Sequence, residues 1–293
     1  MKRRWARLAL LVAVLAPLLV VARVAYRGAT DRLLTLDPPR KVAERSAVSG
    51  IEPLVDVAFV DPHRRTIRGW FHPGTNGATV LLLHGFAANR AQLAPEMHML
   101  AEEGYGFLAY DAPGHGESDG TTTWGDTEQD TLRAAVDFVL QQTSVDPKRL
   151  GALGFSLGGA VLALTAPTEP RIRAVVLEAA FSTLYEEIRG DSGPWGFIAA
   201  KPGQWAIERR GIPVDRIRPK DGVCAIAPRP LLVVIDTVSP LEYEDQKANY
   251  DAACAPKELY EVPGAVHGHY DELDGPTYRK RILGFFGAHL RSP

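Results

Sequence analysis

Apolar runs alternate with amphipathic stretches along most of the chain, and this alternation predicts strands that alternate with helices. Short, mainly apolar runs predict strands and occur at 55–60, 66–71, 79–83, 106–110, 150–155, 174–177, 231–235 and 259–262. Apolar positions at helical spacing occur between them, at 91–103, 127–142, 160–166, 241–252 and 277–290. The alternation predicts an α/β fold with a mainly parallel sheet that helices cover on both faces.

The N-terminal residues 1–26 have a different pattern. Residues 8–22 are apolar and uncharged, and they follow a basic flank at residues 2–7. This arrangement is typical of a signal peptide, with Ala22 at a possible cleavage point, and of a membrane anchor that runs on to Tyr26. We favour the anchor. In either case the positive-inside rule keeps the basic flank in the cytoplasm, so the domain is expected to be exported: membrane-anchored, or secreted or periplasmic after cleavage.

The rest of the chain divides by composition. Residues 27–50 are polar and contain two adjacent prolines, which indicates a linker or a surface wrap. Residues 51–293 are long enough for one domain. Inside it, residues 181–222 interrupt the alternation with glycine, proline and aromatic residues, so we expect a small cap there.

Composition excludes some classes of partner. The net charge is −2, which gives no sign of nucleic-acid binding. The two cysteines, Cys224 and Cys254, fit neither a zinc site nor a C-x-x-C redox motif. No metal-binding cluster or phosphate loop stands out, so we expect no metal and no cofactor. In an exported domain the two cysteines can form a disulfide at the amino-end side of the sheet, and two separate thiols are the alternative.

Candidate chemistry begins at Gly154-Phe155-Ser156-Leu157-Gly158-Gly159, between a predicted strand and a predicted helix. Glycines let the strand and helix approach closely around a tight turn. A serine on that turn projects its hydroxyl from the sheet edge, and the N–H of Leu157 at the helix N-terminus can stabilise an oxyanion. A glycine-rich turn that merely contains a serine is the alternative.

Further polar motifs fall at the carboxyl ends of predicted strands, where open parallel sheets bind ligands. They are His84-Gly85-Phe86, the segment from Asp111 to Ser118, Glu178, Asp236 and His267. A serine hydroxyl is a weak nucleophile and needs a base. His267 and His269 both follow Ser156 and a candidate acid, in the loop before the last helix.

These motifs resemble the α/β-hydrolase superfamily, and most closely its serine esterase, monoacylglycerol-lipase-like and serine-aminopeptidase-like branch. The resemblance covers about residues 55–290 and rests on the segments GWFHP at 69–73, HGF at 84–86, DAPGHGES at 111–118, GFSLGG at 154–159 and VPGAVH at 262–267. It implies the α/β-hydrolase fold and a catalytic order of serine, acid and histidine.

The resemblance also implies roles for individual residues. Ser156 becomes the nucleophile and His267 the base, with His269 as the fallback. The backbone N–H of Phe86 becomes the second oxyanion donor beside that of Leu157. His84 and His115 are expected to be structural.

The acid has two candidates. Asp236 follows a strand and opens Asp-Thr-Val-Ser-Pro, which matches the family, but the turn that precedes the acid in relatives is missing here. Glu178 ends the previous strand, where some relatives place the acid, and its other interpretation is a carboxylate that holds the cap loop. We assign Asp236 and keep Glu178 as its competitor.

The resulting hypothesis is a serine hydrolase that cleaves a carboxylic ester or related acyl bond of a small molecule through an acyl-enzyme. A peptidase or acyltransferase with the same triad, or a non-catalytic exported binding protein on a hydrolase scaffold, are the alternatives. Specificity is expected from the cap, where Trp195, Phe197 and Trp205 would line an apolar pocket or else pack the cap onto the sheet.

Overall fold

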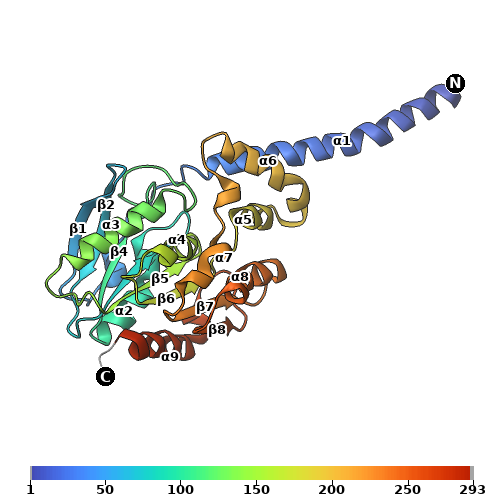
Figure 1. The fold of residues 1–293 in the computed structure, drawn as a ribbon. Coiled ribbons are helices and arrows are strands. Elements are labelled where there is room, and N and C mark those ends of the chain that lie inside the picture. The colour runs from blue at the N-terminus through green and yellow to red at the C-terminus, as the bar shows by residue number, and fades with distance from the viewer. Residues whose placement is uncertain (1, 291–293) are drawn as a thin grey trace.

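A central eight-stranded sheet organises the computed structural model, which describes residues 2–290 (Figure 1). The strand order is β1-β2-β4-β3-β5-β6-β7-β8, and all pairs from β4 to β8 are parallel. The β1–β2 and β2–β4 pairs are antiparallel. The strands are β1 (Val55–Val60), β2 (Thr66–His72), β3 (Thr79–Leu83), β4 (Gly106–Tyr110), β5 (Leu150–Phe155), β6 (Ala174–Glu178), β7 (Leu231–Asp236) and β8 (Lys257–Val262). The predicted fold class is confirmed.

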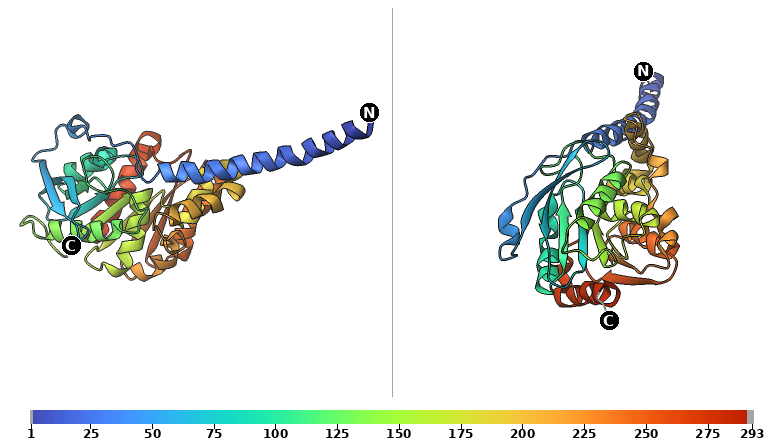
Figure 2. Two further views of the ribbon diagram at one scale, coloured as in Figure 1. Left: turned by 90° about the horizontal axis from the view of Figure 1, so that it is seen from above. Right: turned by 60° about the vertical axis from the view of Figure 1, so that its left-hand side comes forward.

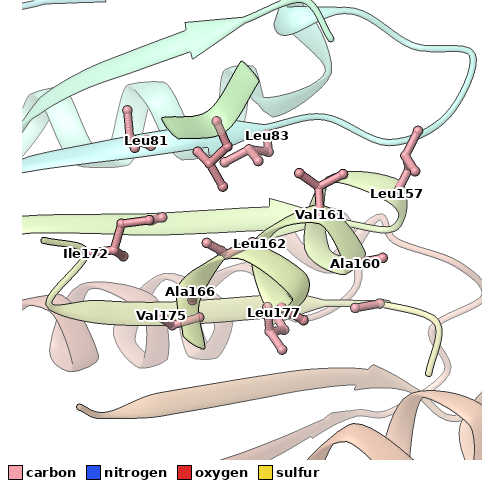
Figure 3. Packing of buried hydrophobic residues seen from close by; sticks show 14 of the residues in the cluster. Leu81, Leu83, Leu157, Ala160, Val161, Leu162, Ala166, Ile172, Val175 and Leu177 are labelled. Carbon is pink, nitrogen blue, oxygen red and sulfur yellow. The ribbon is translucent and has the colours of Figure 1, made fainter. Parts of the chain in front are cut away.

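Helices cover both faces of the sheet and define two apolar cores. Successive residues of a buried strand point to opposite faces, so Leu81 and Leu83 of β3 join one core while Val80 and Leu82 join the other. Figure 3 shows the first core, where α4 packs on Leu83 and Leu177. The helices of the body are α2 (Ala94–Glu102), α3 (Glu128–Leu140), α4 (Leu157–Thr165), α8 (Pro240–Ala252) and α9 (Tyr270–Leu290), which is kinked at Asp274.

Residues 181–222 form a helical insertion between β6 and β7. It contains α5 (Leu184–Asp191), α6 (Gly196–Glu208) and α7 (Pro219–Gly222), joined by short 3₁₀ turns. Because the insertion follows the carboxyl end of β6, it lies at the edge of the sheet where the polar motifs gather.

The N-terminal helix α1 (Lys2–Leu34) is longer than expected. It continues past Tyr26 to Leu34, so the start of the predicted linker at 27–50 is helical, because the end of α1 packs on α6. Its N-terminal part projects from the body (Figures 1 and 2). The segment Leu10–Leu34 contains an 18-residue stretch with a mean hydropathy of 2.0 and is long enough to cross a membrane, a property that signal sequences share.

The two cysteines form a disulfide, as predicted. Cys224 lies in the 3₁₀ turn before β7, and Cys254 lies between α8 and β8. Their Cα atoms are 4.5 Å apart. Both positions precede parallel strands, so the bond is at the amino end of the sheet, opposite the polar motifs.

Loss of this disulfide should destabilise the domain. It closes a loop across 30 residues of sequence, and the loss of that constraint on the unfolded chain should lower the free energy of unfolding by about 3–4 kcal/mol. Urea unfolding with and without a reductant measures the effect. A Cys224→Ser/Cys254→Ser variant is the control, because its unfolding should not respond to the reductant. An unchanged midpoint for the reduced native chain would contradict the prediction.

Candidate active site

Ser156 lies on the turn between β5 and α4, and the backbone there is strained. Its φ is +52° and its ψ is −115°, a conformation that side-chain-bearing residues rarely adopt. Neighbouring glycines make the turn possible. A Cβ on Gly154 would lie 2.4 Å from the carbonyl oxygen of Gly158, and a Cβ on Gly158 would lie 2.2 Å from that of Leu83. The turn therefore presents the Ser156 hydroxyl beyond the end of the strand.

His267 is in hydrogen-bonding contact with Ser156. Its Nε2 lies 3.0 Å from the Ser156 Oγ. The histidine is in the loop between β8 and α9 with a φ of +51°, and its ring packs on Phe155 with centroids 5.2 Å apart. Residues 111 positions apart thus meet at one edge of the sheet. The fallback histidine, His269, is on the surface beside Glu272.

Asp236 is the carboxylate beside His267. It is the last residue of β7 and is fully buried, with its Oδ2 3.8 Å from the His267 Nδ1. That distance exceeds a hydrogen bond, although such contacts are often long without substrate and shorten when it binds. Three donors hold the carboxylate in place: the amide of Gln246 at 2.6 Å, the hydroxyl of Tyr270 at 3.0 Å and the N–H of Gly268 at 3.2 Å.

Glu178 makes a different set of contacts. The Tyr278 hydroxyl lies 2.7 Å from Glu178 Oε1 and 2.6 Å from Glu96 Oε1, and all three groups are buried. Burial raises the pKa of Glu178 well above its usual range and that of Glu96 from about 4.5 to about 7. Glu178 therefore belongs to a buried carboxyl pair bridged by Tyr278.

This pair predicts a pH-dependent contribution to stability. A carboxyl whose pKa is raised by folding stabilises the fold most while it is protonated, so the contribution of Glu96 is lost as the pH rises from about 4.5 to about 7. Glu96→Gln should remove that loss, and its melting temperature relative to the native chain should increase from pH 5 to pH 8. Glu102→Gln, at an exposed position of the same helix, is the control and should show no such trend. Parallel curves for Glu96→Gln and the native chain would refute the prediction.

The two predicted oxyanion donors follow the ends of the neighbouring strands β3 and β5. Leu157 opens α4, so its N–H belongs to the first helical turn, whose N–H groups have no partner within the helix. Phe86 follows β3, which pairs with β5. A Cβ on Gly85 would lie 3.2 Å from the Cβ of Ser156, so the loop of Phe86 passes directly beside the serine. The Phe86 ring stacks on Trp124 at 4.6 Å.

His84 and His115 have structural contacts, as expected. The Nδ1 of His84 lies 2.7 Å from the Gly85 carbonyl oxygen, and its Nε2 accepts the N–H of Ala112 at 2.9 Å. Burial lowers the pKa of His84 to about 3 and also lowers that of His115. Both rings therefore stay neutral and brace the loops behind the site.

A cavity of about 420 Å³ opens beside His267. Its walls come from the end of β6, from α5 and from α8, with Phe181 and Leu241 among the apolar groups. Carboxylates outnumber the basic groups Arg189 and Lys220 in its lining; they are Glu186, Glu187, Glu242, Glu244 and Asp245. The sequence did not indicate this acidic lining, because its members are spread over two helices.

The cap aromatics do not line this cavity, so the apolar pocket predicted for them is not the cavity beside His267. Trp195, Phe197 and Trp205 are 50%, 73% and 56% exposed, and none of them lines the cavity. The cause is the position of α6, which packs on α1 and turns these rings to the outside.

Asp236, Glu242 and His267 offer ligand atoms within 4.8 Å of one another, which is close enough for a metal site. However, both Asp236 oxygens already accept hydrogen bonds, and His267 Nε2 faces Ser156. The donor set fits an oriented base better than a metal centre.

Comparison with known proteins agrees with this geometry. The sequence matches the α/β-hydrolase fold family over residues 78–198. It is 30% identical over 239 residues to the uncharacterized protein Rv2307c of Mycobacterium tuberculosis, covering 78% of each chain, and 27% identical to the uncharacterized protein YfhR of Escherichia coli, covering 80% of this chain and 81% of that one. The Pyrococcus furiosus esterase Pf2001 has a similar structure, with a TM-score of 0.71, 26% identity and coverage of 87% of this chain and 98% of that chain. This chain belongs to the α/β-hydrolase superfamily and is a hydrolase by fold.

Proposed function

We propose that the protein is a serine hydrolase that cleaves a carboxylic ester or a related acyl bond. The observation that carries the proposal is the 3.0 Å contact between Ser156 Oγ and His267 Nε2 on a strained strand–helix turn. The structural similarity to the esterase Pf2001, which is 26% identical in sequence, supports an ester as the substrate.

The proposed reaction uses this chain's own groups. His267 accepts the Ser156 proton as the oxygen attacks the acyl carbon, and the N–H groups of Phe86 and Leu157 stabilise the oxyanion. His267 then protonates the leaving alcohol, which leaves an acyl-serine. Water, deprotonated by His267, attacks the acyl-serine, and its proton returns to Ser156 as the acid is released.

Labelling with a fluorophosphonate probe tests the proposal directly, because the probe reacts with an activated serine. The native chain should be labelled at Ser156, and His267→Ala should lose labelling because the hydroxyl then lacks its base. Absence of labelling in the folded native chain would remove the hydrolase proposal and favour a non-catalytic binding protein.

The acidic cavity favours a second candidate, a peptidase or a related enzyme whose substrate carries an ammonium group. Five carboxylates against two basic groups favour a positive charge near His267. Aminoacyl esters with free and with acetylated amino groups test this idea. A KM that is lower for the free amine supports it, and equal KM values reject it. An acyltransferase would use the same acyl-serine with another acceptor than water.

We also propose that α1 anchors the protein in a membrane with the catalytic domain on the extracytoplasmic side. A basic flank at residues 2–7 precedes the apolar run, and the residues from 10 to 23 are exposed rather than packed on the body. Contact with the body begins near Val24, where the apolar run ends. Release of the protein by detergent but not by carbonate washing would support this anchoring.

A further inference from the structure

The contact surface between α1 and α6, called the seam below, involves Gly28 and Arg32 of α1 and Ala199 and Gly203 of α6. It fixes the position of the cap along the N-terminal helix. A Cβ on Gly28 would lie 2.6 Å from the Ala199 carbonyl oxygen, and one on Gly203 would lie 3.0 Å from Cγ of Arg32. The contacts advance from Gly28 with Ala199 to Arg32 with Gly203, so the two helices run parallel. Small residues let the backbones meet closely, and Arg32 adds a hydrogen bond to the Ile188 carbonyl oxygen.

This register places Trp195 and Phe197 toward the membrane end of the seam. Both precede Ala199, so they lie toward the part of α1 before Gly28, next to the end of the apolar run. In Figure 1 the α5–α6 turn is on the side of the cap toward which α1 leaves the body. The two rings are exposed and stacked, with centroids 6.5 Å apart. Tyr26, on the same stretch of α1, is 70% exposed.

Such a cluster has the composition of a membrane interface. Tryptophan and tyrosine concentrate at the level of the lipid headgroups. Exposed aromatic rings beside an apolar span are therefore stabilised when they enter that layer. Trp205 is a useful contrast: it is eight residues farther along α6 than Phe197, or about 12 Å along the helix axis, and its ring stacks under Arg209.

The same end of the cap borders the cavity. Arg189 and Gly190, at the end of α5, line the cavity and are exposed. Gly196, between Trp195 and Phe197, packs against Arg189, since a Cβ there would lie 2.2 Å from the Arg189 carbonyl oxygen. A bilayer that covers the aromatic pair would therefore adjoin the rim of the cavity beside His267.

We propose that Trp195 and Phe197 insert into the headgroup layer of the membrane that holds α1, and that the site takes an amphiphilic acyl ester from that bilayer. The inference rests on the proposed hydrolase activity and the proposed anchoring. It assigns the exposed cap aromatics to lipid contact and the neighbouring rim to substrate entry.

Site-specific fluorescence in lipid nanodiscs tests the contact. Both native cysteines are disulfide-bonded, so an added cysteine is the only free thiol. Phe197→Cys carries the probe, Val12→Cys reports the span, and Val60→Cys, exposed on β1, reports water. Quenchers attached to shallow positions of the lipids should quench the labels at positions 197 and 12 but not at 60. If the label at position 12 is quenched but the labels at 197 and 60 are not, the inference is overturned and the anchoring remains intact. An unquenched label at 12 overturns both.

Kinetics test substrate entry. Trp195→Ala/Phe197→Ala should lower turnover of a long-chain ester embedded in vesicles by about tenfold, because the lost rings weaken the cap's contact with lipid, and should leave a soluble short-chain aryl ester unaffected. Trp205→Ala, which removes another exposed aromatic ring of the cap, should affect neither. Equal losses on both substrates, or none on vesicles, overturn the inference. Fluorophosphonate labelling of Ser156 in the same samples reports the hydrolase activity separately.

Discussion

Ser156→Ala should abolish hydrolysis of short-chain aryl esters and leave the fold intact. The change removes only the hydroxyl group, which lies 3.0 Å from His267 Nε2. Among residues 2–290, which the structure describes, no other group offers a nucleophile at that position. The loss of the nucleophile of a triad costs on the order of 10⁶ in turnover. Steady-state hydrolysis, with the melting temperature as a check on folding, measures the effect.

A matched control separates this result from a general effect of losing a serine. Ser46 is exposed in the 3₁₀ turn Arg45–Val48, so Ser46→Ala should keep native turnover. Ser156→Ala should also keep the melting temperature within a few degrees, because within residues 2–290 the Oγ has a hydrogen bond only with His267. Native-like activity of Ser156→Ala would end the serine hydrolase proposal.

The parts of the molecule that local sequence determines were predictable. Each buried strand is a short, mostly apolar run, and the turn at Ser156 is recognisable because Gly154 and Gly158 stand where a Cβ would collide with backbone. The polar motifs follow the predicted strands directly in the sequence. Because the carboxyl ends of parallel strands meet at one edge of the sheet, these motifs were expected to lie together.

The contacts between residues far apart in the sequence could not be predicted. Tyr270 and Gln246 hold Asp236, yet neither has a local pattern that marks it as a partner of that carboxylate. The orientation of Trp195 and Phe197 depends on the seam between Gly28 and Ala199, which no periodicity in either helix reveals. Aromatic residues in a cap indicate a ligand pocket only when their helix faces the site.

Asp236→Asn should lower turnover by roughly 10⁴ with little effect on folding. The carboxylate faces His267 Nδ1, and its oxygens accept hydrogen bonds from Gln246, Tyr270 and Gly268. An asparagine can keep the shape but not the charge, and its NH₂ group would oppose the tautomer whose free Nε2 faces Ser156. Single-turnover acylation with an aryl ester isolates the affected step, and circular dichroism checks the fold.

The competing carboxylate supplies the decisive control. Glu178→Gln is isosteric, and its amide can still bond to the Tyr278 hydroxyl, so turnover should stay within about tenfold of native because Glu178 acts in a buried pair rather than on the histidine. If only Glu178→Gln were crippling, Glu178 would be the acid. If neither change lowered turnover, His267 would act with Ser156 as a dyad. The 3.8 Å separation between His267 and Asp236 would then persist during catalysis, and Asp236 would not contribute to the reaction.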